Sequence, residues 1–272
     1  LHEPDTPVCE TCPVITPPER LSPSSIKTFR SCPQKFFLSR IEKIEEPPQW
    51  HLYLGTFVHE VLEHMYKADA SERTEDGAKK FARQCWDSNG WKEKIEALEN
   101  PNGTVPHFMN EAFGNIKNIF RLENPATTEL DGMEHEVVTE VEGVAMRGFI
   151  DRFMFGDNGI VISDYKTGRV PNPRFNTQDD QFFQLLAYAL MLKEAEDEDT
   201  SHVQLLYLTA PVVHELEVTP ERLVVATSTI VETKEALDAA CAAEDFHCNV
   251  TNLCNWCHYK TSGHCPAWKG KN

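Results

Sequence analysis

Two apolar runs separated by a short Gly/Asp/Asn cluster constrain this chain more than any other feature. The first run covers residues 144–155, the second begins at Ile160, and Gly156-Asp-Asn-Gly159 lies between them. Apolar and β-branched runs on both sides of such a cluster predict two antiparallel strands joined by a short loop. Each predicted strand carries one carboxylate, Asp151 in the first and Asp164 in the second. The pattern therefore predicts a twisted sheet with two acids on neighbouring strands.

Asp151, Asp164 and Lys166 form the candidate catalytic group. Side chains two residues apart on a strand face the same side, so Lys166 is expected beside Asp164. Two carboxylates suit Mg²⁺ or Mn²⁺, and an adjacent ammonium can orient a water or stabilise developing negative charge. This is the chemistry of phosphodiester hydrolysis. The alternative is a solvated charge pair, which is less expected at the end of the apolar run 160–162.

Length and charge limit the class of protein. The chain has 272 residues, so one large domain with insertions is expected. It shows no apolar run that could span a membrane, and it begins at Leu1 with no basic-then-apolar leader and no Met, so we expect a cytoplasmic protein with a trimmed or processed start. A net charge of −17 argues against indiscriminate coating of nucleic acid. Basic residues nevertheless gather at 20–43 and 255–272, which fits an enzyme that must release a polyanion.

A cysteine pattern near the end of the chain predicts a metal site. The chain has nine cysteines, and without a secretion signal these indicate metal ligation rather than a disulfide framework. Cys254 and Cys257 have a Cys-x₂-Cys spacing, and Cys265 follows eight residues later. Three thiolates need a fourth ligand, and the candidates are Cys248, His258, His264 or a distant cysteine.

The remaining cysteines predict less. Cys85 and Cys241 lie in helical patterns and are expected to be core thiols. Cys9 and Cys12 form a lone CxxC in the Pro- and Thr-rich arm of residues 1–20. This CxxC could be half of a zinc site or a reactive dithiol, but no second half lies nearby, and we favour an inert arm.

Two helices carry candidate site residues. One is expected to open at Gly55 and to carry His59; a zinc-protease motif is excluded because His64 lies five residues later rather than four. The other, over 179–192, places Gln184 and Tyr188 four residues apart on one face. The alternatives are a packed histidine in the first helix and a helix-edge tyrosine in the second.

The other elements complete the predicted organisation. A helix that starts near Ile26 should break at Cys32, because Pro33 disturbs helical hydrogen bonding. We predict a single domain over 21–272. A helical insertion is expected at about 68–128, with helices over 79–91 and 108–122. The nuclease-like core is expected at about 130–218, with further strands over 133–141, 203–209 and 214–218. A C-terminal helix from Pro220 to about Ala243 is followed by the cysteine segment, which ends at about 268.

Six of these motifs, in this order, resemble the RecB-type branch of the PD-(D/E)XK nuclease superfamily, in particular its iron–sulfur group with Cas4-type, AddB-like and phage members. The resemblance covers roughly residues 21–268. The matching motifs are the helix with Cys32, Gly55-Thr-Phe-Val-His59, Gly148-Phe-Ile-Asp151, Asp164-Tyr165-Lys166-Thr-Gly168, Gln184-x₃-Tyr188, and Cys254, Cys257 and Cys265.

The resemblance implies a role for each matching residue. The catalytic metal would be held by His59, Asp151, Asp164 and the Tyr165 backbone carbonyl, and Lys166 would position the water or stabilise charge. Gln184 and Tyr188 would contact DNA or support the site. A [4Fe–4S] cluster would be held by Cys32, Cys254, Cys257 and Cys265 and would join the two chain ends. The gap between Cys257 and Cys265 is longer than is common in the family, so zinc stays an alternative.

The resemblance also implies a fold and a function. The fold would be α/β and restriction-endonuclease-like, with a mixed sheet flanked by helices. The function would be that of a Mg²⁺- or Mn²⁺-dependent DNA exonuclease that acts on single strands or DNA ends. Its pathway would be recombination, repair or CRISPR-like DNA processing. The expected partners are DNA and either further copies of this chain in a homo-oligomer or the other proteins of a repair or CRISPR assembly. A bacterial or phage source is expected. The alternatives are a non-catalytic DNA-end-binding subunit and a zinc-stabilised interaction module.

Overall fold

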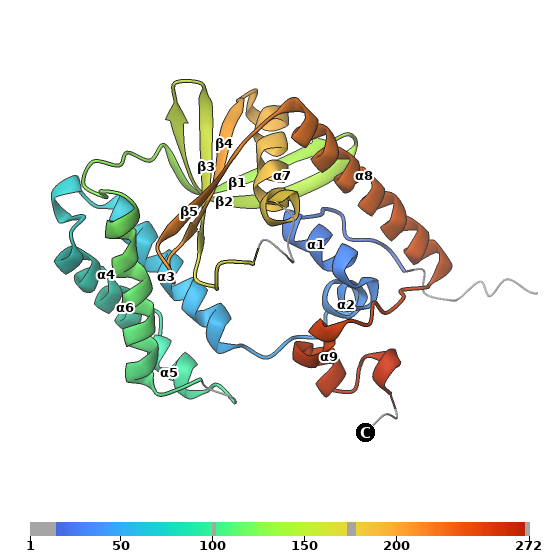
Figure 1. Cartoon of the computed structure of the whole chain (residues 1–272). Coiled ribbons are helices and arrows are strands. Elements are labelled where there is room, and N and C mark those ends of the chain that lie inside the picture. Colours follow the sequence, from blue (N-terminus) through green and yellow to red (C-terminus); the bar gives the residue numbers. More distant parts are fainter. Residues whose placement is uncertain (1–14, 100–101, 173–177, 270–272) are drawn as a thin grey trace, which may run out of the picture. The chain divides into compact units, whose positions relative to one another are not determined.

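The computed structural model describes residues 15–99, 102–172 and 178–269, and the chain forms two compact units (Figure 1). The sheet unit comprises residues 20–24 and 47–230, and the terminal unit comprises residues 25–46 and 231–272 together with the chain up to Glu19. Within the described ranges, no helix is long and apolar enough to cross a membrane. The predicted single domain over 21–272 stays a prediction, and Cys9 and Cys12 lie outside the described residues.

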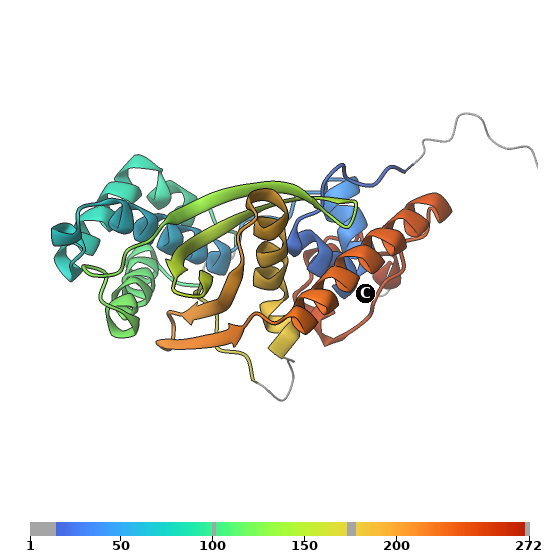
Figure 2. The same cartoon turned by 90° about the horizontal axis from the view of Figure 1, so that it is seen from above.

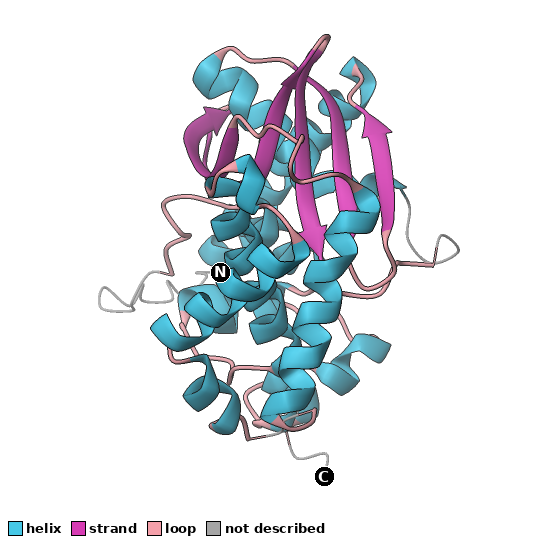
Figure 3. Cartoon of the chain, turned by 90° about the vertical axis from the view of Figure 1, so that its left-hand side faces the viewer, coloured by secondary structure: helices cyan, strands magenta, loops and turns pink. Residues whose placement is uncertain are grey.

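A five-stranded mixed sheet forms the centre of the sheet unit (Figure 3). Its strands follow chain order: β1 (Gly132–Val141), β2 (Val144–Gly156), β3 (Gly159–Lys166), β4 (Thr200–Tyr207) and β5 (Val212–Glu217). All neighbours are antiparallel except β3 and β4, which are parallel. The predicted α/β fold with a mixed sheet flanked by helices is confirmed.

The predicted hairpin is formed by β2 and β3. Gly156 pairs with Gly159 at its tip, so the loop is Asp157-Asn158. Gly159 has a φ of 120°, and a Cβ there would lie 2.5 Å from the Asp199 carbonyl oxygen. A side chain at this position would therefore be both strained and overlapping, which is why glycine ends the turn.

Helix α7 (Gln178–Glu196) makes the crossover between the parallel strands β3 and β4, as parallel neighbours require. It contacts β1, β2, β3 and β4 and lies against the sheet (Figure 2). Its buried side chains include Phe182, Leu186 and Ala189. The helix predicted over 179–192 is confirmed and extends to Glu196.

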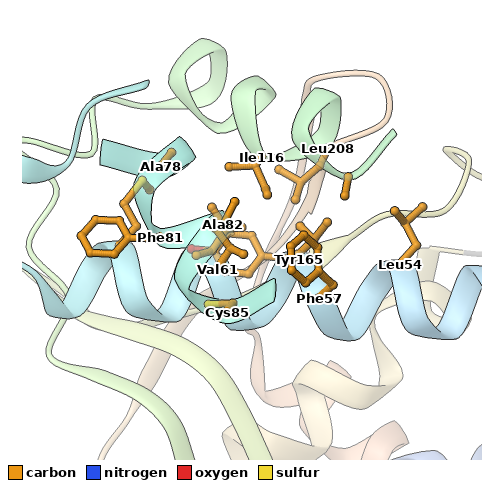
Figure 4. Close-up of a cluster of buried hydrophobic side chains, with 14 of the residues drawn as sticks. Leu54, Phe57, Val61, Ala78, Phe81, Ala82, Cys85, Ile116, Tyr165 and Leu208 are labelled. Carbon is orange, nitrogen blue, oxygen red and sulfur yellow. The ribbon is translucent and has the colours of Figure 1, made fainter. Parts of the chain in front are cut away.

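A second group of helices packs on the sheet around one apolar cluster (Figure 4). The cluster joins Phe57 and Val61 to Ile116, and it reaches the sheet through Tyr165 and Leu208. The helices are α3 (Trp50–Lys67), α4 (Glu75–Ser88), α5 (Trp91–Glu96) and α6 (Val105–Leu122), with a short 3₁₀ turn at Ala70–Glu72. The predicted insertion is therefore part of the core beneath β3 rather than a separate appendage.

Two predicted helix boundaries in this group were wrong. Helix α3 begins at Trp50, five residues before Gly55, which lies in its interior. The helix expected over 79–91 is two helices, because Gly90 has a φ of 61° and interrupts the helix between α4 and α5. A left-handed glycine is a common helix terminator.

The terminal unit joins the two ends of the described chain. Its elements are the latter part of α1 (Pro23–Ser31), α2 (Pro33–Phe36), a π-helical turn (Phe37–Ile41), the latter part of α8 (Pro220–Ala243), α9 (His258–Thr261) and two 3₁₀ turns (Asn252–Trp256 and Pro266–Trp268). The predicted break at Cys32 is confirmed. The Gln34 N–H donates to the His247 carbonyl at 3.1 Å, and the Tyr259 hydroxyl donates to the Ile44 carbonyl at 2.8 Å.

A buried arginine connects the sheet to the helical group. Arg152 of β2 is 1% exposed, and its guanidinium makes two hydrogen bonds to Glu123, at 2.6 and 2.8 Å, and one to the Tyr165 hydroxyl at 3.0 Å. Its charge also lies 5.6 Å from the centre of the Tyr66 ring and 5.0 Å from that of Tyr165. The Tyr66 hydroxyl donates to Glu123 as well. A bidentate, ring-stacked contact of this kind requires arginine.

We predict that Arg152→Ala lowers the free energy of unfolding by about 3–5 kcal/mol, because it leaves the Glu123 carboxylate without its buried counter-charge. Chemical denaturation measures this effect. Arg147→Ala is the matched control on the same strand, since Arg147 forms an exposed ion pair with Glu136. The control should change stability by about 1 kcal/mol or less. Equal effects of the two substitutions would contradict the importance of the buried network.

Candidate metal-dependent active site

The two strand carboxylates lie at the same level of the sheet. Asp151 is one residue beyond the pair Arg152–Ser163, which places it level with Asp164 on the neighbouring strand. Lys166 Nζ lies 2.5 Å from Asp164 Oδ2, and the Asp164 side chain is only 5% exposed. The structure therefore brings together all three residues of the predicted catalytic group.

His59 reaches this level from α3. Its Nδ1 lies 3.4 Å from Asp151 Oδ2, and its Nε2 lies 3.0 Å from the Tyr165 carbonyl oxygen. The backbone N–H of Tyr165 donates to the same Asp151 oxygen at 3.1 Å. If Nε2–H donates to the carbonyl, the neutral ring presents its Nδ1 lone pair to a carboxylate. Two such acceptors facing one another are stabilised by a proton or a metal cation between them.

Burial and mutual repulsion control the protonation of the acids. Burial raises the pKa of Asp151 well above its ordinary value, and the Asp164 carboxylate raises it further. The Lys166 ammonium and the Tyr165 N–H oppose this rise in the Asp151 pKa. With both carboxylates ionised, Asp151 and Asp164 would carry one more negative charge than Lys166 balances. Such a site gains more from a bound divalent cation than a neutral one does.

A cavity of about 470 Å³ opens onto these groups. Its lining includes His59, Asp151 and the Tyr165–Lys166 segment, and Gly55 and Thr56 of α3 line it as well. Asp164 is not part of the lining, in keeping with its burial. The donors that meet here are an imidazole nitrogen, carboxylate oxygens and a backbone carbonyl, and this set fits Mg²⁺ or Mn²⁺.

Gln184 and Tyr188 meet beside the site. The Gln184 amide donates to the Tyr188 hydroxyl at 3.2 Å. Gly148 of β2 makes room for the tyrosine ring, because a Cβ on Gly148 would lie 2.5 Å from it. Burial raises the pKa of Tyr188 to about 12, and Asp151 and Asp164 contribute to that rise. Tyr188 therefore lies close enough to both carboxylates for them to raise its pKa.

Five thiols line one pocket of the terminal unit. These are the four cysteines assigned by the family resemblance and one more: Cys32, Cys254, Cys257, Cys265 and Cys248. Cys248 Sγ lies 3.7 Å from Cys265 Sγ. Burial is the main cause that raises the pKa of the Cys265 thiol, and Cys248 adds to it.

The histidine alternatives are less well placed. Neither His258 nor His264 is among the residues that line this pocket. Cys85 and Cys241 are buried, so the prediction that they are core thiols is confirmed.

Comparison with known proteins decides the family. Residues 20–264 match the sequence model of the PD-(D/E)XK nuclease superfamily. The chain belongs to this superfamily. The Gene 69 protein of Mycobacterium phage D29 is 27% identical over 188 residues, covering 62% of this chain and 67% of that protein. A candidate exonuclease from Eubacterium rectale superposes with a TM-score of 0.57 at 15% identity, covering 88% of each chain, and so shares the fold.

Membership of the nuclease superfamily implies a nucleic-acid substrate and is consistent with a divalent metal cofactor. The matched region contains every candidate site residue named above, from His59 to Tyr188, and four of the five pocket cysteines, Cys32, Cys248, Cys254 and Cys257. Cys265 lies one residue beyond its end.

The sequence prediction missed Glu134 of β1. The nearest ligand atoms of His59, Glu134 and Asp151 all lie within 4.8 Å of one another. Glu134 falls between the pairs Met133–Arg152 and His135–Ile150, level with Asp151. A signal was present: Val141 pairs with Val144 across a two-residue turn, and counting back from that turn places position 134 opposite 151.

We predict that Asp151→Asn stabilises the protein in EDTA at neutral pH. The raised pKa means that the folded state holds a proton which the unfolded state releases near pH 4, so stability falls as pH rises through the folded-state pKa. Asparagine removes that loss and can still accept the Tyr165 N–H. The thermal midpoint of Asp151→Asn in EDTA should therefore rise above that of the wild type as the pH increases, by roughly 2–4 °C for each kcal/mol of relieved repulsion.

Asp87→Asn, on the exposed face of α4, is the control for this experiment and should match the wild type at every pH. A wild-type midpoint that stays level with the Asp151→Asn midpoint between pH 5 and 8 would contradict the proposed repulsion.

Proposed function

We propose that this chain is a divalent-metal-dependent DNA nuclease of the RecB-like branch, and that it acts as an exonuclease on single strands or DNA ends. The observation that carries the proposal is the meeting of His59, Asp151 and the Tyr165 carbonyl within 3.0–3.4 Å, next to the Asp164–Lys166 pair. Membership of the PD-(D/E)XK superfamily supports the reaction class. The fold shared with a candidate exonuclease is consistent with it.

The proposed metal ligands are the His59 imidazole, the Asp151 and Asp164 carboxylates and the Tyr165 carbonyl. A divalent cation bound there would supply Lewis-acid activation of water and of the scissile phosphate. The protein supplies the geometry: the Tyr165 N–H orients Asp151, and the Tyr165 carbonyl orients His59. Both contacts come from one residue of β3, so the strand itself sets the spacing of the ligands.

Lys166 has a separate proposed role. Its side chain is 36% exposed and lines the cavity, while its ammonium stays paired with Asp164. An ammonium at this place stabilises the negative charge that develops on the phosphoryl oxygens during hydrolysis, and it also positions the attacking water by hydrogen bonding. Gln184 and Tyr188 are proposed to support the site or contact the DNA backbone.

We predict that Lys166→Ala lowers the rate of DNA cleavage at least about a hundredfold, because it removes preorganised positive charge from the site. The measurement is digestion of end-labelled single- and double-stranded DNA with Mg²⁺, Mn²⁺ or EDTA. The position of the label in the products reports polarity. Lys79→Ala removes an exposed helical lysine and serves as the control for net charge.

Three outcomes of this assay separate the hypotheses. Metal-dependent shortening of DNA that is lost in Lys166→Ala supports the exonuclease. Full activity in Lys166→Ala, Asp151→Asn and Asp164→Asn would contradict the site assignment. DNA-end binding without cleavage by the wild type would favour the accessory end-binding subunit.

The pocket of thiols supports a second part of the proposal, a [4Fe–4S] cluster held by Cys32, Cys254, Cys257 and Cys265. A single zinc ion with bonds of about 2.3 Å brings tetrahedral sulfurs to roughly 3.8 Å from one another. The separation of 3.7 Å between Cys248 Sγ and Cys265 Sγ is compatible with such a zinc ion. The preference for a cluster therefore rests on the order of the cysteine motifs along the chain and on the meeting of these thiols in one pocket.

We predict that the protein purified without oxygen contains about four irons and four sulfides per chain and is coloured. Cys254→Ser should lose this iron and destabilise the terminal unit. Cys248→Ser is the matched control, since it changes a thiol of the same pocket outside the assigned set. A colourless wild type that contains zinc would contradict the cluster.

A further inference from the structure

Glu134 of β1 lines the cavity of the proposed metal site, beside His59 and Asp151. Along the sheet, β1 places Glu134 level with Asp151 of β2, which is in turn level with Asp164 of β3. The nearest ligand atoms of Glu134, Asp151 and His59 lie within 4.8 Å of one another, and all three residues line the cavity of about 470 Å³. Glu134 is therefore within reach of a cation bound by the other two.

The other glutamates of the cavity are already engaged. Glu60 accepts hydrogen bonds from Asn89 and from the Trp91 indole. Glu63 is paired with Lys67 on the next turn of α3. For Glu134, the described residues provide no hydrogen bond and no ion pair. Its carboxylate is thus the one glutamate of this lining that keeps its acceptor capacity for a ligand.

The backbone at Glu134 is unusual as well. Its φ is 44°, in the left-handed region that non-glycine residues rarely adopt. Neighbouring β1 positions on both sides stay in register with β2. The strand therefore accommodates a local distortion at the one position that faces Asp151.

We propose that Glu134 is a further ligand of the divalent cation in this pocket, in addition to the ligands proposed above. This inference rests on the proposed nuclease function and extends its ligand set to β1. An imidazole nitrogen together with carboxylate oxygens forms a donor set that accommodates Mn²⁺ as well as Mg²⁺.

Mn²⁺ binding to the full chain tests the ligand directly. Electron paramagnetic resonance measures free Mn²⁺ during a titration without DNA, at fixed pH and salt. Glu134→Gln should weaken Mn²⁺ binding about tenfold or more, on the scale of losses seen when groups around a metal site are removed. Glu134→Asp keeps the charge but shortens the side chain, so its Mn²⁺ affinity should lie between those of the wild type and Glu134→Gln. Glu140→Gln on the same strand makes the same charge change at an exposed position and should bind like the wild type.

Each outcome either supports or overturns the inference. Weaker binding in Glu134→Gln, with wild-type binding in Glu140→Gln, supports it. Wild-type affinity in Glu134→Gln, together with weak binding in Asp151→Asn, overturns the role of Glu134 and leaves the nuclease proposal intact. Wild-type affinity in both Glu134→Gln and Asp151→Asn would overturn the metal site itself. Thermal unfolding in EDTA confirms that each variant is folded before its titration is interpreted.

Discussion

The contact between Arg152 and Tyr165 is the interaction on which the site depends. Arg152 binds the Tyr165 hydroxyl, lies over its ring, and is itself held by Glu123 at the end of α6. The backbone of the same tyrosine donates to Asp151 and accepts from His59. Because these contacts fix the position of the Tyr165 side chain, they also fix its backbone N–H and carbonyl, which orient the proposed ligands Asp151 and His59. Precision at the site thus comes from packing on the helical group.

This arrangement also separates charge. The buried guanidinium is neutralised by Glu123, so it does not offset the charge of the candidate carboxylates Asp151 and Asp164. Burial raises the pKa of Asp151, and Lys166, which pairs with Asp164, opposes that rise. Lys67 likewise opposes the rise that burial causes in the pKa of Glu134. A divalent cation at the proposed site would compete with protons for these carboxylates.

Local periodicity explains which of these features could be predicted from the sequence. The hairpin and the Asp164–Lys166 pair follow from alternation along short strands, and Gln184 and Tyr188 follow from helical spacing. His59 became a candidate through the resemblance of Gly55-Thr-Phe-Val-His59 to a family motif, although its helix begins five residues earlier than expected. Predicting that Glu134 lies opposite Asp151 would have required the register of β1 and β2, which the Glu142-Gly143 turn sets. The first residue of that turn, a glutamate with positive φ, is not typical of tight hairpins, so the sequence did not mark the turn clearly. The Arg152–Glu123 pair joins residues of different elements, and no local pattern marks such a contact.

The terminal unit shows how a cross-link and ordinary contacts would act together. Hydrogen bonds such as Tyr259 to Ile44 and Gln34 to His247 already join the two chain ends, each worth about 1 kcal/mol. Cys32 and Cys254 are more than 200 residues apart. In the loop-entropy treatment of cross-links, closing so long a loop stabilises the folded chain by about 5 kcal/mol. The proposed cluster would therefore stabilise an arrangement that the protein contacts specify, and its loss would loosen the ends without scrambling the strands that carry Asp151 and Asp164.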